Sequence, residues 1–313
     1  MNTYPKEDHR PENGPPSFYQ QIKTAAGPEG LPQDFSLQKV PEPEGLHFVD
    51  GGTDGIAMFH TSIQPGELGE LTEILSLITK GDSRAKERLE VFFRGQKGMA
   101  PMLSLVDGLQ DWITGHREEL DPQRLFDFAL HTLWESREVE CVKFALSLLE
   151  LVETEKNQAR EAVSTLALSD EFTLFCSYII RDWSDGSEEL FRLAKLVRGW
   201  GRIFLLRQLD PEDPRVREWL LWEGWQNDVL VSYTAKLCAG AGGLLELLRR
   251  ESLTGEELEN VKGLMAGLLD EGPVQNISAM EDGPEILREY LRHLAAHDQE
   301  DEEARKKLAE LTA

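Results

Sequence analysis

The chain has few cysteines, few basic residues and no long hydrophobic run in its 313 residues. Its three cysteines, Cys141, Cys176 and Cys238, are far apart and lie in apolar stretches, which is typical of buried free thiols and leaves no set for a disulfide framework. The sequence has no apolar core at its N-terminus and no run of about 18 apolar residues, so it predicts neither a signal peptide nor a membrane helix. We therefore expect a cytoplasmic protein.

Positive charge is scarce, because 33 Lys and Arg residues stand against 57 Asp and Glu residues and the formal net charge is -24. A molecule with this average field repels a phosphate backbone, so nucleic acid is not the expected partner. The hydrophobic content of 40% is enough for a sizeable core, which excludes a wholly disordered chain.

Catalytic motifs are also missing. The sequence contains no phosphate-binding loop, and the glycine pair Gly199 and Gly201 is followed by Phe204, where a dinucleotide fingerprint requires Gly or Ala. A nucleophile elbow, a C-x-x-C pair and an H-E-x-x-H helix are all absent. We therefore predict no catalytic residue, no cofactor and, by preference, a protein that is not an enzyme.

What the sequence has is a repeated helical pattern. From Glu67 onward, apolar positions at helical spacing recur about every 15 to 20 residues between turn and cap signals. Pro122 and Pro214 each follow an aspartate, and Thr254 begins a capping box with Glu257. The predicted helices span roughly residues 67–80, 83–94, 99–115, 122–135, 137–153, 156–168, 170–182, 187–208, 214–223, 227–239, 242–250, 255–270, 284–297 and 299–311. This pattern predicts an all-α fold of stacked antiparallel helix pairs.

The N-terminal part differs in composition. Eight of the fifteen prolines lie between Pro5 and Pro43, so we expect residues 1–45 to form a flexible arm. Residues 46–49 and 56–60 flank a glycine-rich turn, which predicts a short β-ribbon within a cap of residues 46–64. Residues 65–313 are then the helical-repeat domain.

The spacing of two helical units, residues 121–152 and 213–250, resembles that of the armadillo/HEAT class of α-solenoids. The sequence Arg-Gly-Trp-Gly-Arg-Ile at residues 198–203, with residues 219–221 and 224–228, is similar to uncharacterised bacterial helical-repeat proteins. The resemblance implies an α-solenoid and no activity. Because the units do not align residue by residue, a compact irregular helical domain remains an alternative.

One segment departs from the acidic average. Between Phe191 and Leu209 it holds five basic residues and no acidic one, namely Arg192, Lys195, Arg198, Arg202 and Arg207. On one continuous helix, Lys195, Arg198 and Arg202 would form a basic row opposite an apolar face. The row would either pair with neighbouring acidic helices or bind an acidic peptide or a phosphorylated group beside Trp200 and Trp225.

Two further sets of polar residues are candidates. Asp228 and Asp282 could act as bases if the chain were an enzyme, although we expect helix capping. Glu289, His293 and His297 have the spacing of metal ligands on one helical face, but an exposed polar face has the same spacing, so we predict no metal.

The leading functional hypothesis is therefore a protein- or peptide-binding helical-repeat module that is not an enzyme. The alternative is an enzyme or binder that uses the basic row to hold a phosphorylated or anionic ligand. A minor alternative is a nucleic-acid-associated helical-repeat protein, since some base-excision glycosylases share this class of architecture.

Overall fold

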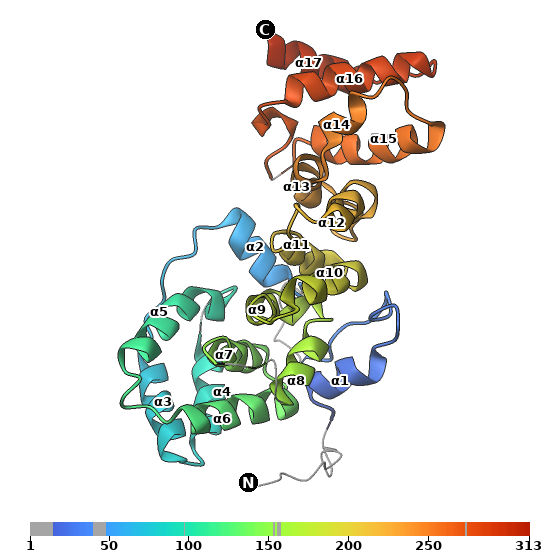
Figure 1. The fold of residues 1–313 in the computed structure, drawn as a ribbon. Coiled ribbons are helices and arrows are strands. Elements are labelled where there is room, and N and C mark those ends of the chain that lie inside the picture. Colours follow the sequence, from blue (N-terminus) through green and yellow to red (C-terminus); the bar gives the residue numbers. More distant parts are fainter. Residues whose placement is uncertain (1–14, 40–47, 97, 153, 155–157, 273) are drawn as a thin grey trace. The chain divides into compact units, whose positions relative to one another are not determined.

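A computed structural model describes residues 15–39, 48–96, 98–152, 154, 158–272 and 274–313, and over these residues the chain is helical (Figure 1). The described part contains no β-strand, only an isolated bridge between Gly27 and Gly30. The prediction of an all-α fold is confirmed.

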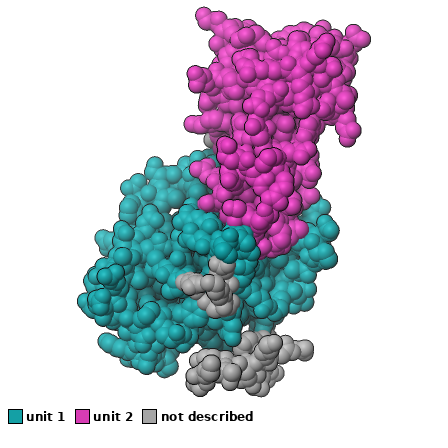
Figure 2. Space-filling view, in the orientation of Figure 1, with its two compact units in different colours: residues 1–186 teal, residues 187–313 magenta. Residues whose placement is uncertain are grey.

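The chain divides into two compact units, Met1–Gly186 and Ser187–Ala313, which Figure 2 colours separately. In the described residues the helices up to the boundary are α1 (Phe18–Ala25), α2 (Gly52–His60), α3 (Glu70–Lys80), α4 (Ala85–Gly95), α5 (Pro101–Gly115), α6 (Pro122–Glu135), α7 (Val139–Leu149), α8 (Gln158–Leu166) and α9 (Asp170–Ile180). Those that follow are α10 (Gly186–Leu196), α11 (Gly199–Leu206), α12 (Pro214–Trp219), a π-helical turn (Leu220–Gly224), α13 (Ser232–Gly242), α14 (Leu244–Leu248), α15 (Gly255–Leu269), a 3-10 turn (Ile277–Ala279), α16 (Gly283–Ala296) and α17 (Glu302–Thr312).

Helix α7 is the centre of the first unit. Every residue from 141 to 149 is buried, because α4, α5, α6 and α9 pack around it. Helix α3 packs on α4 and α6, and α8 packs on α9 and α6. A helix buried on all sides is apolar on all sides, and Lys143 is the one charged residue in this stretch.

The second unit is built from helices that contact both the next helix and the next but one. Helix α13 packs on α11 and α15, and α15 packs on α17. Helix α16 packs on α14 and α17. The core of this unit is aliphatic, with Leu258, Leu264 and Leu287 fully buried.

Helix α1 lies inside the stretch that we expected to be a flexible arm, so that expectation is wrong for Phe18–Ala25. Ser17 and Gln20 form a capping box, and Phe18 and Ile22 are fully buried where α1 packs on α6 and α8. Residues 1–14 and 40–45 of the predicted arm lie outside the described residues. The proline-rich composition suggested that burial would be too small to offset the entropy cost of ordering this segment. The burial of two large apolar side chains offsets that cost.

The predicted β-ribbon is not found either. Residues 56–60, expected as its second strand, belong to helix α2, and residues 46–47 lie outside the described part. Gly51, with a left-handed φ of 71°, precedes the helix. The helix places Asp54 and Ala57, three residues apart, on one buried face, an arrangement that the alternation of a strand would not give.

The three cysteines are free and buried, as the sequence predicted. Burial raises the pKa of each thiol, so none is a reactive thiolate at neutral pH. Among the helices of the described residues, none combines the length and the apolar character that a bilayer-spanning segment needs.

Candidate functional site: a basic segment, a buried ion cluster and an apolar hollow

The basic segment is not one helix. Helix α10 ends at Leu196 and α11 begins at Gly199, whose φ of 68° is left-handed. The side chain of Asn227 fixes this break, because its Oδ1 accepts from the Gly199 amide at 2.7 Å and its Nδ2 donates to the Gly199 carbonyl at 3.0 Å. The prediction of a continuous helix over residues 187–208 is therefore wrong, and the basic row does not form.

Arg202 points inward instead of joining a row. It is 5% exposed and donates to the carbonyl oxygens of Val197 at 2.9 Å, Lys195 at 3.3 Å and Gln226 at 2.6 Å. Lys195 lies in the last turn of α10 and Val197 directly follows the helix, so the guanidinium caps α10 where its dipole favours a cation. Burial lowers the pKa of Arg202. This side chain stabilises the fold and does not face a ligand.

The other basic residues of the segment lie at the surface and contact their own unit. Arg192 pairs with Glu189 at 2.7 Å, Lys195 lies over the ring of Phe191 at 4.4 Å, and Arg198 is 3.6 Å from Asp228. Arg207 is exposed and directly follows α11. The arrangement agrees better with basic residues that pair within the chain than with an open anion-binding site.

The aromatic and acidic candidates are also dispersed. Trp200 is buried against Phe204 and Tyr233, and Trp225 is half-buried, with its ring next to Gly263. Asp282 precedes α16 as its N-terminal flanking residue, and its side chain makes no capping hydrogen bond.

The three candidate metal ligands do not converge. Glu289 pairs with Arg292 at 2.7 Å, while Nε2 of buried His293 lies 2.8 Å from the Leu248 carbonyl oxygen. Nδ1 of His297 faces the carbonyl oxygen of His293 at 3.0 Å. Within the described ranges no group of three ligand-type side chains is placed to hold a metal ion.

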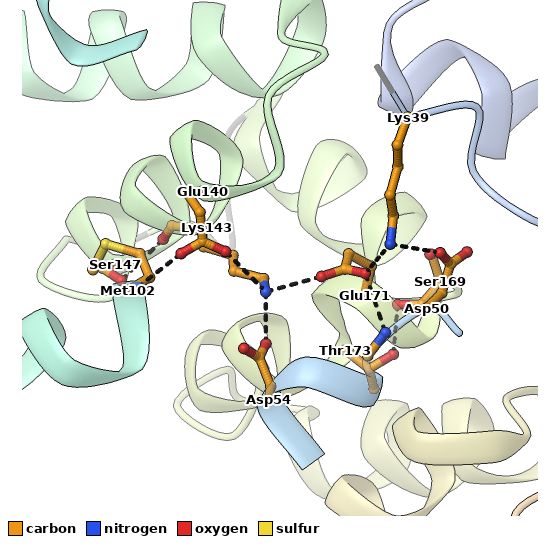
Figure 3. Close-up of polar contacts among 11 residues, drawn as sticks. Lys39, Asp50, Asp54, Met102, Glu140, Lys143, Ser147, Ser169, Glu171 and Thr173 are labelled. Carbon is orange, nitrogen blue, oxygen red and sulfur yellow. Dashed lines mark hydrogen bonds and ion pairs between the residues drawn. The ribbon is translucent and has the colours of Figure 1, made fainter. Parts of the chain in front are cut away.

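The most unusual polar feature of the first unit was not predicted from the sequence. Lys143, fully buried on α7, lies 2.8 Å from Asp54 Oδ2 on α2, 2.9 Å from Glu171 Oε1 on α9 and 3.3 Å from Glu140 Oε1 (Figure 3). Lys39 extends this buried ion cluster, because its Nζ lies 2.6 Å from Glu171 Oε2 and 2.9 Å from Asp50 Oδ1. The Gly51 amide also donates to Glu171 Oε2, at 3.2 Å.

The cluster holds four carboxylates against two ammonium groups, so its members differ in proton affinity. Burial by itself would raise the pKa of Glu171, but Lys143 and Lys39 outweigh it and bring the pKa to about 2. Burial raises the pKa of Asp54 to about 6, against the attraction of Lys143, and neither Asp54 oxygen accepts a hydrogen bond of regular geometry in the described part. For Lys143 the three carboxylates outweigh burial and raise the pKa well above its ordinary value.

This geometry suits anchoring and not catalysis. Lys143, Asp54 and Glu171 are at most 3% exposed, so no substrate in solvent reaches them, and a fully charged ammonium is not a nucleophile. The cluster joins Lys39, Asp50 and helix α2 to α7 and α9. A sequence signal existed, since a lysine within an apolar stretch with no polar face predicts a buried, paired cation.

The first unit also has an apolar hollow of about 240 Å³ at its surface. It is formed by the end of α5, the loop after it, the first turns of α6 and the end of α7, which Figure 1 labels. Its lining is Ile113, Thr114, Arg117, Leu120, Pro122, Leu125, Phe126, Leu148, Leu151 and Val152. Leu151 is 40% exposed, so an apolar side chain is available to a partner here. The hollow was not predicted from the sequence, because its residues come from three helices and from loops between them.

No family model matches the chain, and neither a curated protein nor a solved structure matches it.

Proposed function

We propose that this chain is a protein-binding helical-repeat module that is not an enzyme, and that the apolar hollow is where it contacts its partner. The observation that carries the proposal is the hollow itself. About 240 Å³ is below the range of about 300 to 1,000 Å³ that small-molecule sites occupy, but it accommodates an apolar side chain of a protein.

The packing pattern supports an α-solenoid of the armadillo/HEAT type. Within the first unit α5, α7 and α9 contact one another in succession, and α6 contacts α8. Within the second unit α11, α13, α15 and α17 form such a series, with α14 on α16 beside it. Two rows of alternate helices are what a stack of helix pairs produces, and such stacks commonly present binding surfaces.

Peptide binding by two matched variants tests the function. The probe is a labelled 14-residue amphipathic peptide with leucine at helical spacing and glutamine at all other positions, measured by fluorescence anisotropy. Leu151→Glu places a carboxylate in the hollow, while Leu230→Glu makes the same change at a 58% exposed leucine that does not line it. Burying one leucine contributes about 1.5–3 kcal/mol, so Leu151→Glu should weaken binding by at least about tenfold and Leu230→Glu should not. Equal affinity of all three proteins refutes the proposal.

The contacts given above for the basic segment do not favour an enzyme that holds a phosphorylated ligand through it. Arg202 is buried on carbonyl oxygens, and Arg192 and Arg198 lie beside carboxylates. The net charge of -24 does not favour nucleic-acid binding, because it repels a phosphate backbone. The three free, buried thiols support the proposal of a cytoplasmic location.

A further inference from the structure

We infer that the hollow binds a basic amphipathic helix of another protein, with an apolar side chain in the hollow and Lys or Arg side chains over the acidic residues around it. This inference rests on the proposed function and specifies its partner. It reverses the charge expected from the sequence, where the basic segment suggested an acidic or phosphorylated ligand.

Several acidic residues lie next to or close to the lining residues in sequence. They form an acidic rim, defined here as Asp111, Glu118, Glu119, Asp121 and Asp127. The only basic residues in the same stretch, residues 111–127, are Arg117 and Arg124. The rim therefore has a surplus of three negative charges beside an apolar surface.

The two arginines do not neutralise the whole rim. Arg117 pairs with Glu118 at 3.5 Å, and Arg124 pairs with Asp121 at 3.4 Å. Asp111 and Glu119 are exposed and have no ion-pair partner among the described residues. Asp111 lies three residues before Thr114, a lining residue, on the same side of α5. Two exposed carboxylates without an ion-pair partner in the described part therefore lie close in sequence to lining residues, although Arg117 of the lining is itself basic. Their charge attracts cations.

The hollow suits a helical partner better than an extended one. An extended peptide gains most of its affinity by adding to a sheet edge, and the described residues contain no strand that would provide one. A helix satisfies its own backbone and needs only a place for its apolar side chains, and the hollow has room for one or two. Lysines on the flanks of such a helix then reach the rim.

Three peptides with identical leucine positions test the charge of the partner. Their remaining positions are alternately lysine and glutamine, all glutamine, or alternately glutamate and glutamine. At 50 mM NaCl the lysine peptide should bind at least about tenfold more tightly than the glutamine peptide, and the glutamate peptide should bind least. At 300 mM NaCl this difference should shrink, because salt screens exposed charges.

A pair of charge variants separates the rim from the overall charge of the molecule. Asp111→Lys with Glu119→Lys changes the rim, and Glu218→Lys with Glu251→Lys makes the same change in net charge at exposed acidic residues outside it. Circular dichroism and thermal unfolding establish that both variants are folded. Only the rim variant should lose the preference for the lysine peptide, by about tenfold.

Two results overturn the inference, and they differ from failure of the proposed function. Equal losses in both charge variants would mean that the net charge alone attracts the lysine peptide. Equal affinity of the lysine and glutamine peptides for the wild type would mean that the acidic rim does not favour a basic partner. In either case, binding that still depends on Leu151 leaves the proposed function standing, whereas binding of no peptide refutes both.

Discussion

Replacement of Lys143 by methionine is the strongest test of the buried ion cluster. The side chain is fully buried and has three carboxylate partners within 3.3 Å. In the variant, Glu171 keeps its contact with Lys39 at 2.6 Å, but Asp54 is left buried without any cation among the described residues. Removing one partner of a buried pair costs about 3–5 kcal/mol, so we expect the free energy of unfolding to fall by that amount at pH 7.

Urea unfolding followed by circular dichroism measures this loss, with Lys86→Met as the matched control. Lys86 pairs with Glu135 at 3.4 Å, and both side chains are about half exposed, so its replacement should cost less than about 1 kcal/mol. Acidification should reduce the cost of Lys143→Met, because Asp54 can then take up a proton and lose its charge.

The double variant Lys143→Met with Asp54→Asn separates charge from packing. It removes the uncompensated carboxylate, so it should recover part of the stability that Lys143→Met loses. A loss of less than about 1 kcal/mol at pH 7 in the single variant would refute the reasoning, as would a double variant whose loss equals the sum of the two single losses.

Three further predictions concern stability. The pKa of Asp54 is about 6 in the folded chain against 3.8 as the ordinary value, so its contribution is fully present below about pH 4 and is lost as the pH rises through 6. The stability of the wild type relative to Asp54→Asn should therefore fall by about 2–3 kcal/mol between pH 4 and pH 7, measured by urea unfolding. Gly199→Ala should cost about 1–2 kcal/mol because the φ of Gly199 is 68°. Gly240→Ala, in α13 with open space where the Cβ would lie, should stabilise the fold by about 0.5–1 kcal/mol. If both variants shift the midpoint of thermal unfolding in the same direction, this reasoning is wrong. Arg202→Met leaves carbonyl oxygens at the end of α10 without their donor and should cost about 1–3 kcal/mol, while Arg198→Met should cost less than about 1 kcal/mol in the same assay.

The helices were largely predictable because their signals are local. The helix predicted at residues 122–135 matches α6, since Asp121 accepts from the Gln123 and Arg124 amides and proline follows it. The capping box of Thr254 and Glu257 begins α15 as expected. Each of these signals acts within one turn of helix, so no knowledge of the rest of the chain is needed.

The errors occurred where a distant residue decides the local conformation. The break before α11 depends on Asn227, which is 28 residues away and holds the Gly199 backbone. Helix α2 depends on partners on α7 and α9, because Asp54 lies on the face that meets Lys143 and the Gly51 amide before the helix donates to Glu171. Periodicity in a short glycine-containing segment does not contain this information.

By itself the sequence determined the fold class, the acidic character of the molecule and the burial of its cysteines. These properties follow from composition and from interactions between residues a few positions apart. Only the tertiary structure decided the burial and the partners of the charged residues: Lys143 is buried among carboxylates from three helices, and Arg202 caps a helix. It also decided that parts of α5, α6 and α7 form the apolar hollow. The reason is physical, since the free energy of a charge depends on its burial and its partners in space, and these are fixed only when the helices pack.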